Sequence, residues 1–196
     1  MIIIAHRINT ISALKNLSFK YGVEVDIRSK GKKIIIHHDP FKQGESFFKW
    51  IKYFNHKFLI LNVKEEGLEN KLIDCMKKNN IKNYFFLDQS FPFLIKFSNL
   101  GFKNCAARVS EFEKINTVLT LKGKINWIWV DCFSEFPLSK KNYSILKNAN
   151  FNICLVSPEL HGRNPDKEIP KLKKLIVKLN FKFDAVCTKR PELWEI

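Results

Sequence analysis

Short apolar runs alternate with longer amphipathic stretches along almost the whole chain. The runs are rich in β-branched and aromatic residues, which is typical of strands, whereas the stretches between them repeat apolar residues at helical spacing. The pattern predicts strands at 2–6, 23–27, 58–64, 84–88, 105–109, 127–131, 152–156 and 185–188. It predicts helices near 10–20, 43–54, 66–79, 91–100, 111–121, 138–149 and 167–180.

The segment RSKGKKIIIHH, residues 28–38, breaks this alternation. Lys30 and Gly31 stand between two strand-like runs with no helix separating them, which is typical of a β-hairpin. We therefore expect a small hairpin excursion after the second strand, before the alternation resumes.

Strands that alternate with helices predict an α/β fold with a parallel sheet. The chain has no linker rich in Pro, Gly or Ser, so we expect residues 1–196 to form one domain. A single (β/α)8 TIM barrel, small against the typical ~250 residues, is favoured over a doubly wound open sheet. Almost every run is apolar until its C-terminal end, where reactive side chains follow. A barrel gathers these ends at one rim, whereas an open sheet spreads them along a line.

Composition indicates the size of the core and the cellular compartment of the protein. Hydrophobic residues make up 45% of the chain, which is enough for a sizeable core. No apolar stretch approaches the roughly 20 residues that cross a bilayer, and the N-terminus lacks the pattern of a signal peptide, so we expect a cytoplasmic protein. The five cysteines are odd in number, widely spaced and without a C-x-x-C pair. They indicate reduced, buried thiols.

The net charge of +15 suggests an anionic partner. The lysines are scattered over nearly every helical stretch, however, and there is no RNP-like, helix-turn-helix or zinc-finger pattern. We therefore expect no nucleic-acid partner, and a basic field that attracts a small anionic substrate. The seven glycines form neither a G-x-G-x-x-G nor a Walker-type phosphate loop.

Arginine is scarce, because only five of the 34 basic residues are arginines. In a chain that prefers lysine, each arginine marks a place where a planar, permanently charged fork is needed. All five lie at or just beyond the ends of strand-like runs: Arg7, Arg28, Arg108, Arg163 and Arg190.

The second strand carries two carboxylates, Glu24 and Asp26. Side chains alternate along a strand, so both point to the same side, and they repel each other unless a cation lies between them. On an exposed strand this would be a solvated edge, but a central strand is expected here. Hard oxygen ligands favour Mg²⁺ or Ca²⁺.

Histidines end two of the apolar runs. By the same alternation, Ile34, Ile36 and His38 share one face, so that His38 faces the site and His37 points outward. His6 and His38 each have a charged neighbour in the sequence, and together they are candidates for an acid and base pair that works near neutral pH.

The segments IAHR, GVEVDIR and IIIHHDP, taken in order, resemble the opening third of the glycerophosphodiester phosphodiesterase and phosphatidylinositol-phospholipase-C-like barrels. Those barrels show HR, then E-x-D, then HD at similar spacing. Later segments are similar to compact bacterial members of that superfamily, so the resemblance spans nearly the whole chain: LNVKEEGL, FLDQS, RVSEFE, WVDCF, CLVSPELHGR and VCTKRPELW.

The resemblance implies metal-assisted cleavage of a phosphodiester next to a hydroxyl group. His6 and His38 would be the general base and general acid, and Glu24 and Asp26 would hold a divalent cation, Mg²⁺ or Ca²⁺. The cations on the phosphate would come from three further residues: Arg7, Lys64 and Arg108.

One position departs from the family pattern. Where the phosphodiesterases usually carry E-x-K after the third strand, this chain has Asn62, Val63 and Lys64. The amide of Asn62 still offers an oxygen to the metal but no charge, so we expect weaker metal binding. Glu66 has the same parity and would compensate if the strand ran that far.

The later motifs leave alternatives open. Arg108, Ser110, Glu111 and Asp131 are candidates to line the pocket and select the leaving group, with helix capping and structural pairing as the alternative for Ser110 and Glu111. Asp88 and Glu159 have the same ambiguity. Trp127 and Trp129 are expected in the core, and Arg163 either reaches a phosphate or caps an element.

Asn62 and the basic charge keep a second function open, a non-catalytic or repurposed barrel that binds an anionic metabolite or a surface-glycan precursor. A nonspecific polyanion binder is a third. The pattern predicts neither the substrate nor the oligomeric state.

Overall fold

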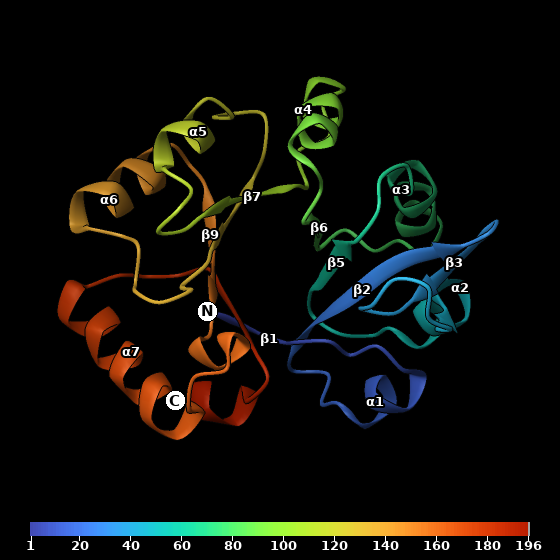
Figure 1. Cartoon of the computed structure of the whole chain (residues 1–196), viewed down its shortest axis with the longest axis horizontal. Helices are drawn as coiled ribbons and strands as arrows, with labels where there is room; N and C mark the ends of the chain where they lie inside the picture. The colour runs from blue at the N-terminus through green and yellow to red at the C-terminus, as the bar shows by residue number, and fades with distance from the viewer. Residues whose placement is uncertain (196) are drawn as a thin grey trace.

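The computed structural model describes residues 1–195 and places a curled parallel sheet inside a layer of helices (Figure 1). Its parallel strands are β1 (Ile2–Ala5), β2 (Gly22–Lys30), β5 (Leu59–Val63), β6 (Tyr84–Leu87), β7 (Ala106–Val109), β8 (Trp127–Val130), β9 (Asn152–Val156) and β10 (Ala185–Thr188). The helices are α1 (Ile11–Asn16), α2 (Phe47–Trp50), α3 (Glu69–Lys78), α4 (Phe91–Asn99), α5 (Ile115–Leu119), α6 (Lys140–Asn148) and α7 (Pro165–Leu179). Short 3-10 turns complete it: η1 (Ile51–Tyr53), η2 (Pro158–His161) and η3 (Pro191–Trp194). None of these described helices is long and apolar enough to cross a membrane.

The parallel strands follow the order β6, β5, β2, β1, β10, β9, β8, β7. The two end strands approach each other and meet at one bridge, between Phe86 and Cys105. The backbone N–H of Phe86 donates there to the carbonyl of Asn104 at 2.8 Å. We call this sparsely paired junction of β6 and β7 the seam. The sheet is thus α/β and consistent with a barrel that the seam closes.

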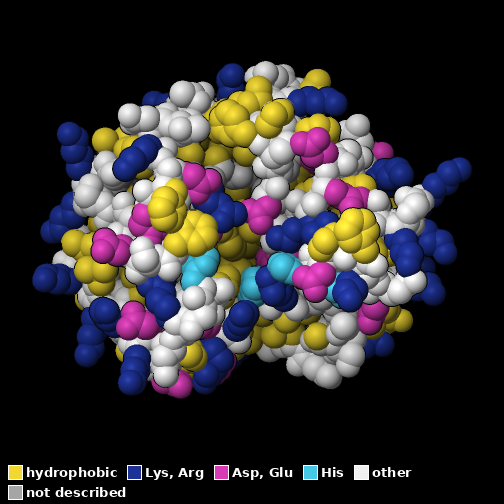
Figure 2. Space-filling view, in the orientation of Figure 1, with side chains coloured by type: hydrophobic (Ala, Val, Ile, Leu, Met, Phe, Trp, Pro, Cys, Tyr) yellow, Lys and Arg dark blue, Asp and Glu magenta, His cyan; other side chains and the backbone are white. Residues whose placement is uncertain are grey.

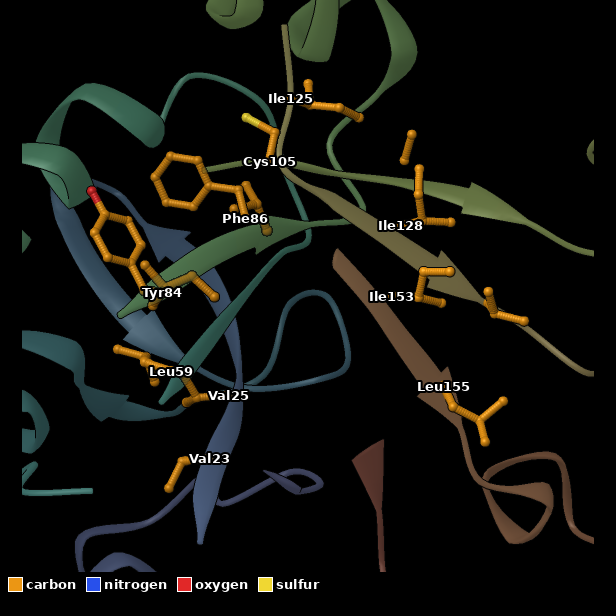
Figure 3. Close-up of a cluster of buried hydrophobic side chains, with 14 of the residues drawn as sticks. Val23, Val25, Leu59, Tyr84, Phe86, Cys105, Ile125, Ile128, Ile153 and Leu155 are labelled. Atoms are coloured by element: carbon orange, nitrogen blue, oxygen red, sulfur yellow. The ribbon is translucent and has the colours of Figure 1, made fainter. Parts of the chain in front are cut away.

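Two apolar clusters lie on opposite faces of the curled sheet. The outer cluster packs between strands and helices and includes Val23, Val25 and Leu59 (Figure 3). The inner cluster contains Ile60, which alternates with Leu59 along β5. The remaining inner side chains are Ile4, Phe58, Phe85, Leu87, Ala106, Trp127, Trp129, Cys154, Val156, Ala185 and Cys187. Because side chains alternate along a strand, the outward direction of Val23 and Val25 places Glu24 and Asp26 on the inner side.

After the second strand the chain turns back on itself. β2 runs to Lys30 and pairs antiparallel with β3 (Lys33–Ile36), and Gly31 takes a φ of 59° in the turn. β4 (Glu45–Ser46) then adds to β3, so the helix predicted for 43–54 begins only at Phe47. Gly44 allows this pairing, because it lies against the backbone of Ile36.

Replacement of Gly44 by alanine is expected to destabilise this region. The added Cβ would lie 2.1 Å from the carbonyl oxygen of Ile36, closer than any real contact of this kind, so the loop must shift. We expect Gly44→Ala to lower the free energy of unfolding by about 1–3 kcal/mol, measured by urea denaturation. The exposed neighbour substitution Gln43→Ala is the control and should change it little. Equal stability of both variants would contradict the close approach.

Two other helices begin later than the pattern predicts. α3 starts at Glu69, after Gly67 with a φ of 88°. α5 starts at Ile115, because Glu111 binds a neighbouring loop and does not begin the helix. Its carboxylate accepts from the backbone N–H groups of Phe133 at 3.2 Å and Ser134 at 2.7 Å. A residue that bridges two loops leaves no signal in the periodicity of its own segment.

The cysteines are buried free thiols, as the sequence predicts. Burial raises the pKa of the Cys105 and Cys132 thiols to about 12. These two thiols therefore stay protonated at neutral pH, which excludes them as nucleophiles.

Candidate active site

The C-terminal ends of β1, β2 and β5 bring the predicted residues together. His6 and Arg7 follow β1, and Glu24 and Asp26 lie in β2. Asp26 pairs in register with Asn62 of β5. Figure 2 shows histidine side chains beside a hollow in the middle of this face, with basic and acidic side chains around it. The strand ends thus form one candidate site.

Glu24 is fully buried and holds two hydrogen bonds. Its Oε1 accepts from Asn62 Nδ2 at 2.9 Å, and its Oε2 accepts from the backbone N–H of Arg7 at 2.7 Å. Burial, and then the nearby charge of Asp26, raise the pKa of Glu24 to about 7. A cation beside the pair would favour the charged form of both carboxylates.

Asp26, also fully buried, lies among donors and cations. The side chain of Asn9 donates to Asp26 Oδ2 at 2.8 Å and accepts from its backbone N–H at 3.0 Å. Lys64 Nζ lies 3.5 Å from Oδ1, and Arg7 Nε lies 3.8 Å from Oδ2. Sequence reasoning missed Asn9, because an asparagine in a loop carries no pattern of its own.

His6 is a neutral imidazole in this setting. Its Nε2 lies 3.7 Å from Glu24 Oε2. Burial, followed in order by the charges of Arg7, Lys189, Lys64 and His38, lowers the pKa of His6 to about 3. A neutral imidazole has a free ring nitrogen that can accept a proton.

His38 lies at the rim beyond the end of β3. Its side chain is 41% exposed, and its Nδ1 pairs with Asp39 Oδ1 at 2.8 Å. Arg28 Nε donates to the His38 carbonyl at 3.0 Å, which anchors the loop. His37 Nδ1 instead accepts from the backbone N–H of Asp39 at 2.9 Å. Because β3 ends at Ile36, strand alternation no longer separates the two histidines, and their assignment stays a prediction.

Two site residues have a left-handed backbone. Arg7 has a φ of 56° and Asp88 a φ of 59°, and each follows a strand of the sheet. Side chains other than glycine rarely adopt this conformation, and they concentrate at functional positions when they do. At Arg7 the turn aims the backbone N–H at Glu24.

Lys64 and Arg108 have different surroundings. Lys64 Nζ lies between Asp26 and Asp88, 3.2 Å from Asp88 Oδ2. The Arg108 fork pairs with Asp88 and also with Asp131, at 2.5 Å for the latter. Glu113 lies 3.8 Å from Arg108 Nε. Arg108 is therefore paired with carboxylates on every side, whereas Lys64 adjoins the buried acidic pair.

Glu159 organises the end of β10, which is paired with β1 beside His6. Its carboxylate accepts from the Ser157 hydroxyl, from Thr188 Oγ1 at 2.5 Å and from the backbone N–H of Lys189 at 2.9 Å. It therefore fixes the end of β10, from which Lys189 acts on the pKa of His6. Lys189 does not stand out in the sequence because lysine is so common there.

Several other polar side chains near the rim have partners within the fold. The Arg163 guanidinium donates to the backbone carbonyls of Cys132 and of Ser134, at 3.2 Å for Ser134. Ser110 Oγ donates to Glu113 Oε2 at 2.8 Å and closes a turn. His161, which the pattern did not single out, pairs with Asp131.

Glu66 does not join the acidic pair. β5 ends at Val63, and the Glu66 carboxylate accepts instead from the Ser90 hydroxyl. The suggestion that Glu66 compensates for Asn62 is therefore wrong, because the strand stops before it.

Glu24, Asp26 and Asn62 fit a hard cation in their chemistry. In the described part of the chain no group of three His, Cys, Asp or Glu residues is placed to hold a metal, and the amide of Asn62 lies in register with Asp26 beside the two carboxylates. Asp26 Oδ1 and Asn62 Oδ1 are both buried, and neither receives a hydrogen bond from a described residue. Lys64 Nζ lies 3.5 Å from Asp26 Oδ1, so the carboxylate oxygen faces a cation and the amide oxygen has no polar partner among the described residues. Carboxylate and amide oxygens are the donors that Mg²⁺ and Ca²⁺ prefer.

Neither a family model nor a curated protein sequence matches the chain. Solved structures do. A glycerophosphodiester phosphodiesterase from Agrobacterium tumefaciens str. C58 is 10% identical, with a TM-score of 0.70 over 99% of each chain. A glycerophosphoryl diester phosphodiesterase from Parabacteroides distasonis ATCC 8503 is 12% identical, with a TM-score of 0.64 over 98% of this chain and 84% of that one. The fold is that of the glycerophosphodiester phosphodiesterases.

This likeness confirms the predicted resemblance at the level of the fold. The same fold also occurs with another activity, since a mutant tryptophan synthase alpha-subunit from Pyrococcus furiosus matches with a TM-score of 0.55 and 11% identity, over 97% of this chain and 88% of that one. Function in such folds depends on the site and not on the architecture. The reaction must therefore be argued from the residues.

Proposed function

We propose that this protein cleaves a small phosphodiester of the glycerophosphodiester type inside a (β/α)8 barrel. The observation that supports it most is the neutral His6 beside the buried pair of Glu24 and Asp26, with Lys64 and Arg7 within 4 Å of Asp26. Bases, hard oxygen donors and fixed cations are the groups that cleavage of a phosphodiester needs.

In the proposed reaction His6 takes the proton of a hydroxyl group next to the phosphodiester, and Glu24 stabilises the resulting imidazolium. The oxygen then attacks phosphorus, the bond to the second alcohol breaks, and His38 returns a proton to the leaving alkoxide. Arg7 and Lys64 bind the phosphoryl oxygens.

Glu24, Asp26 and Asn62 would hold the divalent cation. When bound, such an ion supplies positive charge that offsets the charge developing on the phosphate. With two carboxylates and one amide, we propose a weaker metal site than three carboxylates would form.

Turnover of a panel of glycerophosphodiesters, with Mg²⁺, Ca²⁺, Mn²⁺ or EDTA, tests this proposal. Bis(p-nitrophenyl) phosphate is the control, because it has no hydroxyl group that could attack its own phosphorus. We expect metal-dependent release of product by the wild type. EDTA should abolish it, and an Asp26→Asn variant should need far more metal. Persistent activity in EDTA would contradict the metal site.

The uncharged Asn62 favours one competing function, a barrel that binds an anionic metabolite without cleaving it. In that case calorimetry would show binding of a phosphorylated compound that survives EDTA and the His6→Ala substitution, with no turnover of any diester.

Asn62→Glu is expected to tighten metal binding. A third carboxylate adds charge next to Glu24 and Asp26, which the cation neutralises, so the dissociation constant for Mg²⁺ or Ca²⁺ should fall by about tenfold or more. Isothermal titration calorimetry measures it. The matched control is Asn148→Glu, which adds the same charge to the exposed surface of α6. An unchanged affinity in Asn62→Glu would place the metal elsewhere.

A further inference from the structure

A cavity of about 840 Å³ lies at the seam between β6 and β7. Leu87 and Ala107 line it from these two strands, Leu94 from α4 and Val118 from α5. In Figure 2 the surface between α4 and α5 is hollowed and has apolar side chains on its walls. We call it the seam cleft. Its size lies within the range of small-molecule sites, and its lining is mostly apolar, as in such sites.

Three of the four charged side chains that line the seam cleft pair with one another: Arg108, Asp88 and Glu113. The fourth, Lys114, is exposed to solvent. Arg108 lines the cleft, but Asp88, Asp131 and Glu113 surround its guanidinium. An arginine that is already shared among carboxylates offers little to a phosphate. An apolar group can enter such a space without separating a free charge from water.

Phenylalanines stand around the cleft with much of their surface in water. Phe91 is 48% exposed, Phe112 78% and Phe133 38%. The rings of Phe112 and Phe133 lie 5.9 Å apart, centre to centre. Exposed aromatic rings gathered at the edge of a concave surface indicate an apolar ligand.

The seam cleft continues into the candidate active site through one residue. Asp88 lines the cleft and also accepts from Lys64 Nζ at 3.2 Å, while the same ammonium lies 3.5 Å from Asp26. A phosphate bound by Lys64 would therefore be one side chain away from the cleft. This continuity favours a substrate group as the occupant over a separate molecule.

We infer that the seam cleft binds the leaving alcohol of the phosphodiester and that this alcohol is apolar. The inference rests on the proposed function and extends it, since it names the substrate class as diesters between a hydroxyl-bearing headgroup and an alkyl or aromatic alcohol. Lys64 and Arg7 hold the phosphate, and Phe112, Phe133 and the walls of the cleft bury the alcohol.

Glycerophosphodiesters of ethanol, hexanol and 2-phenylethanol test the inference, because they share the phosphate and the attacking hydroxyl. Burial of four more methylenes should raise kcat/KM for the hexyl ester above that of the ethyl ester by about tenfold or more. A matching gain for the phenylethyl ester shows that the cleft accepts aromatic alcohols, and its absence shows a preference for alkyl chains.

Variants locate the preference. Thr117→Trp fills the cleft from α5, and Phe112→Ala removes one exposed ring, so both should reduce the ratio of hexyl to ethyl kcat/KM severalfold. The control is Phe48→Ala, which removes a ring that is 44% exposed from α2, away from the cleft, and should leave the ratio unchanged. Thermal melts of the three variants show whether each is folded.

The outcomes separate the inference from the proposed function. Turnover with equal kcat/KM for all three esters overturns the apolar cleft but leaves the phosphodiesterase intact. If no ester is cleaved, the proposed function fails, and calorimetry with ethyl phosphate and hexyl phosphate decides the cleft alone. Tighter binding of hexyl phosphate that Thr117→Trp removes supports an apolar site there, whereas equal affinity overturns it.

Discussion

His6→Ala is expected to lower kcat/KM for the best diester by about two to four orders of magnitude, the usual contribution of a positioned proton acceptor. Alanine has no group to take the proton of the attacking hydroxyl. The fold should survive, because the buried Nδ1 of His6 makes no hydrogen bond with a described residue. Initial rates measure the loss, and circular dichroism with a thermal melt confirms folding.

Variants of the two histidines that follow β3 provide the comparison. His38→Ala should cause a loss comparable to that of His6→Ala, whereas His37→Ala should stay within about twofold of the wild type, since it is not placed in the reaction. Added imidazole should restore part of the rate to His6→Ala. Equal losses in His37→Ala and His38→Ala would contradict the choice between these two residues, and an active His6→Ala would overturn the mechanism.

Glu24→Gln is expected to abolish metal-dependent activity and at the same time to stabilise the metal-free protein at alkaline pH. Burial and the charge of Asp26 raise the pKa of Glu24 from 4.5 to about 7. The folded protein therefore holds this proton more tightly than the unfolded chain does. The stabilising effect of the protonated group is complete below about pH 4.5 and is lost as the pH rises through 7.

The Glu24→Gln substitution removes that titration. At about 1.36 kcal/mol for each unit of pKa, ionisation of Glu24 costs on the order of 3 kcal/mol above pH 7. The amide introduced by this substitution would also find a partner in Asn62 Oδ1, which receives no hydrogen bond from the described residues of the wild type.

Urea denaturation in EDTA at pH 5 and pH 8 measures the effect. The stability of Glu24→Gln relative to the wild type should be greater at pH 8 than at pH 5 by about 1–3 kcal/mol. Glu135→Gln, at an exposed position, is the control and should show no such difference. If the difference in free energy of unfolding between Glu24→Gln and the wild type is the same at both pH values, folding does not raise the pKa of Glu24.

Strand alternation predicts the centre of the site well. The apolar Val23 and Val25 face the helices, so the carboxylates between them face inward, as a period of two requires. The eight strand runs also lie close to their predicted bounds, because a buried parallel strand is a continuous apolar segment that ends where polar residues begin.

Long-range polar contacts could not be predicted in the same way. The partners of Arg108 are Asp88 and Asp131, which are 20 and 23 residues away and come from two other strand ends. Which carboxylate an arginine meets depends on the paths of several loops, and these leave no periodic pattern. The contact of Glu111 with the loop at 133–135, made in place of a helix start, could not be predicted for the same reason.

The seam was equally hidden, since the runs of β6 and β7 look as strand-like as the others. Its consequence concerns the motions of the protein. With one bridge between these strands, the sheet opens there more readily than between β2 and β5, where five residue pairs are in register. Amide hydrogens of β6 and β7 should then exchange with solvent faster than those of β2. An alcohol in the seam cleft binds only while β6 and β7 are paired. Bound alcohol therefore slows the exchange of these amide hydrogens, and the affinity for the alcohol depends on how often the two strands separate.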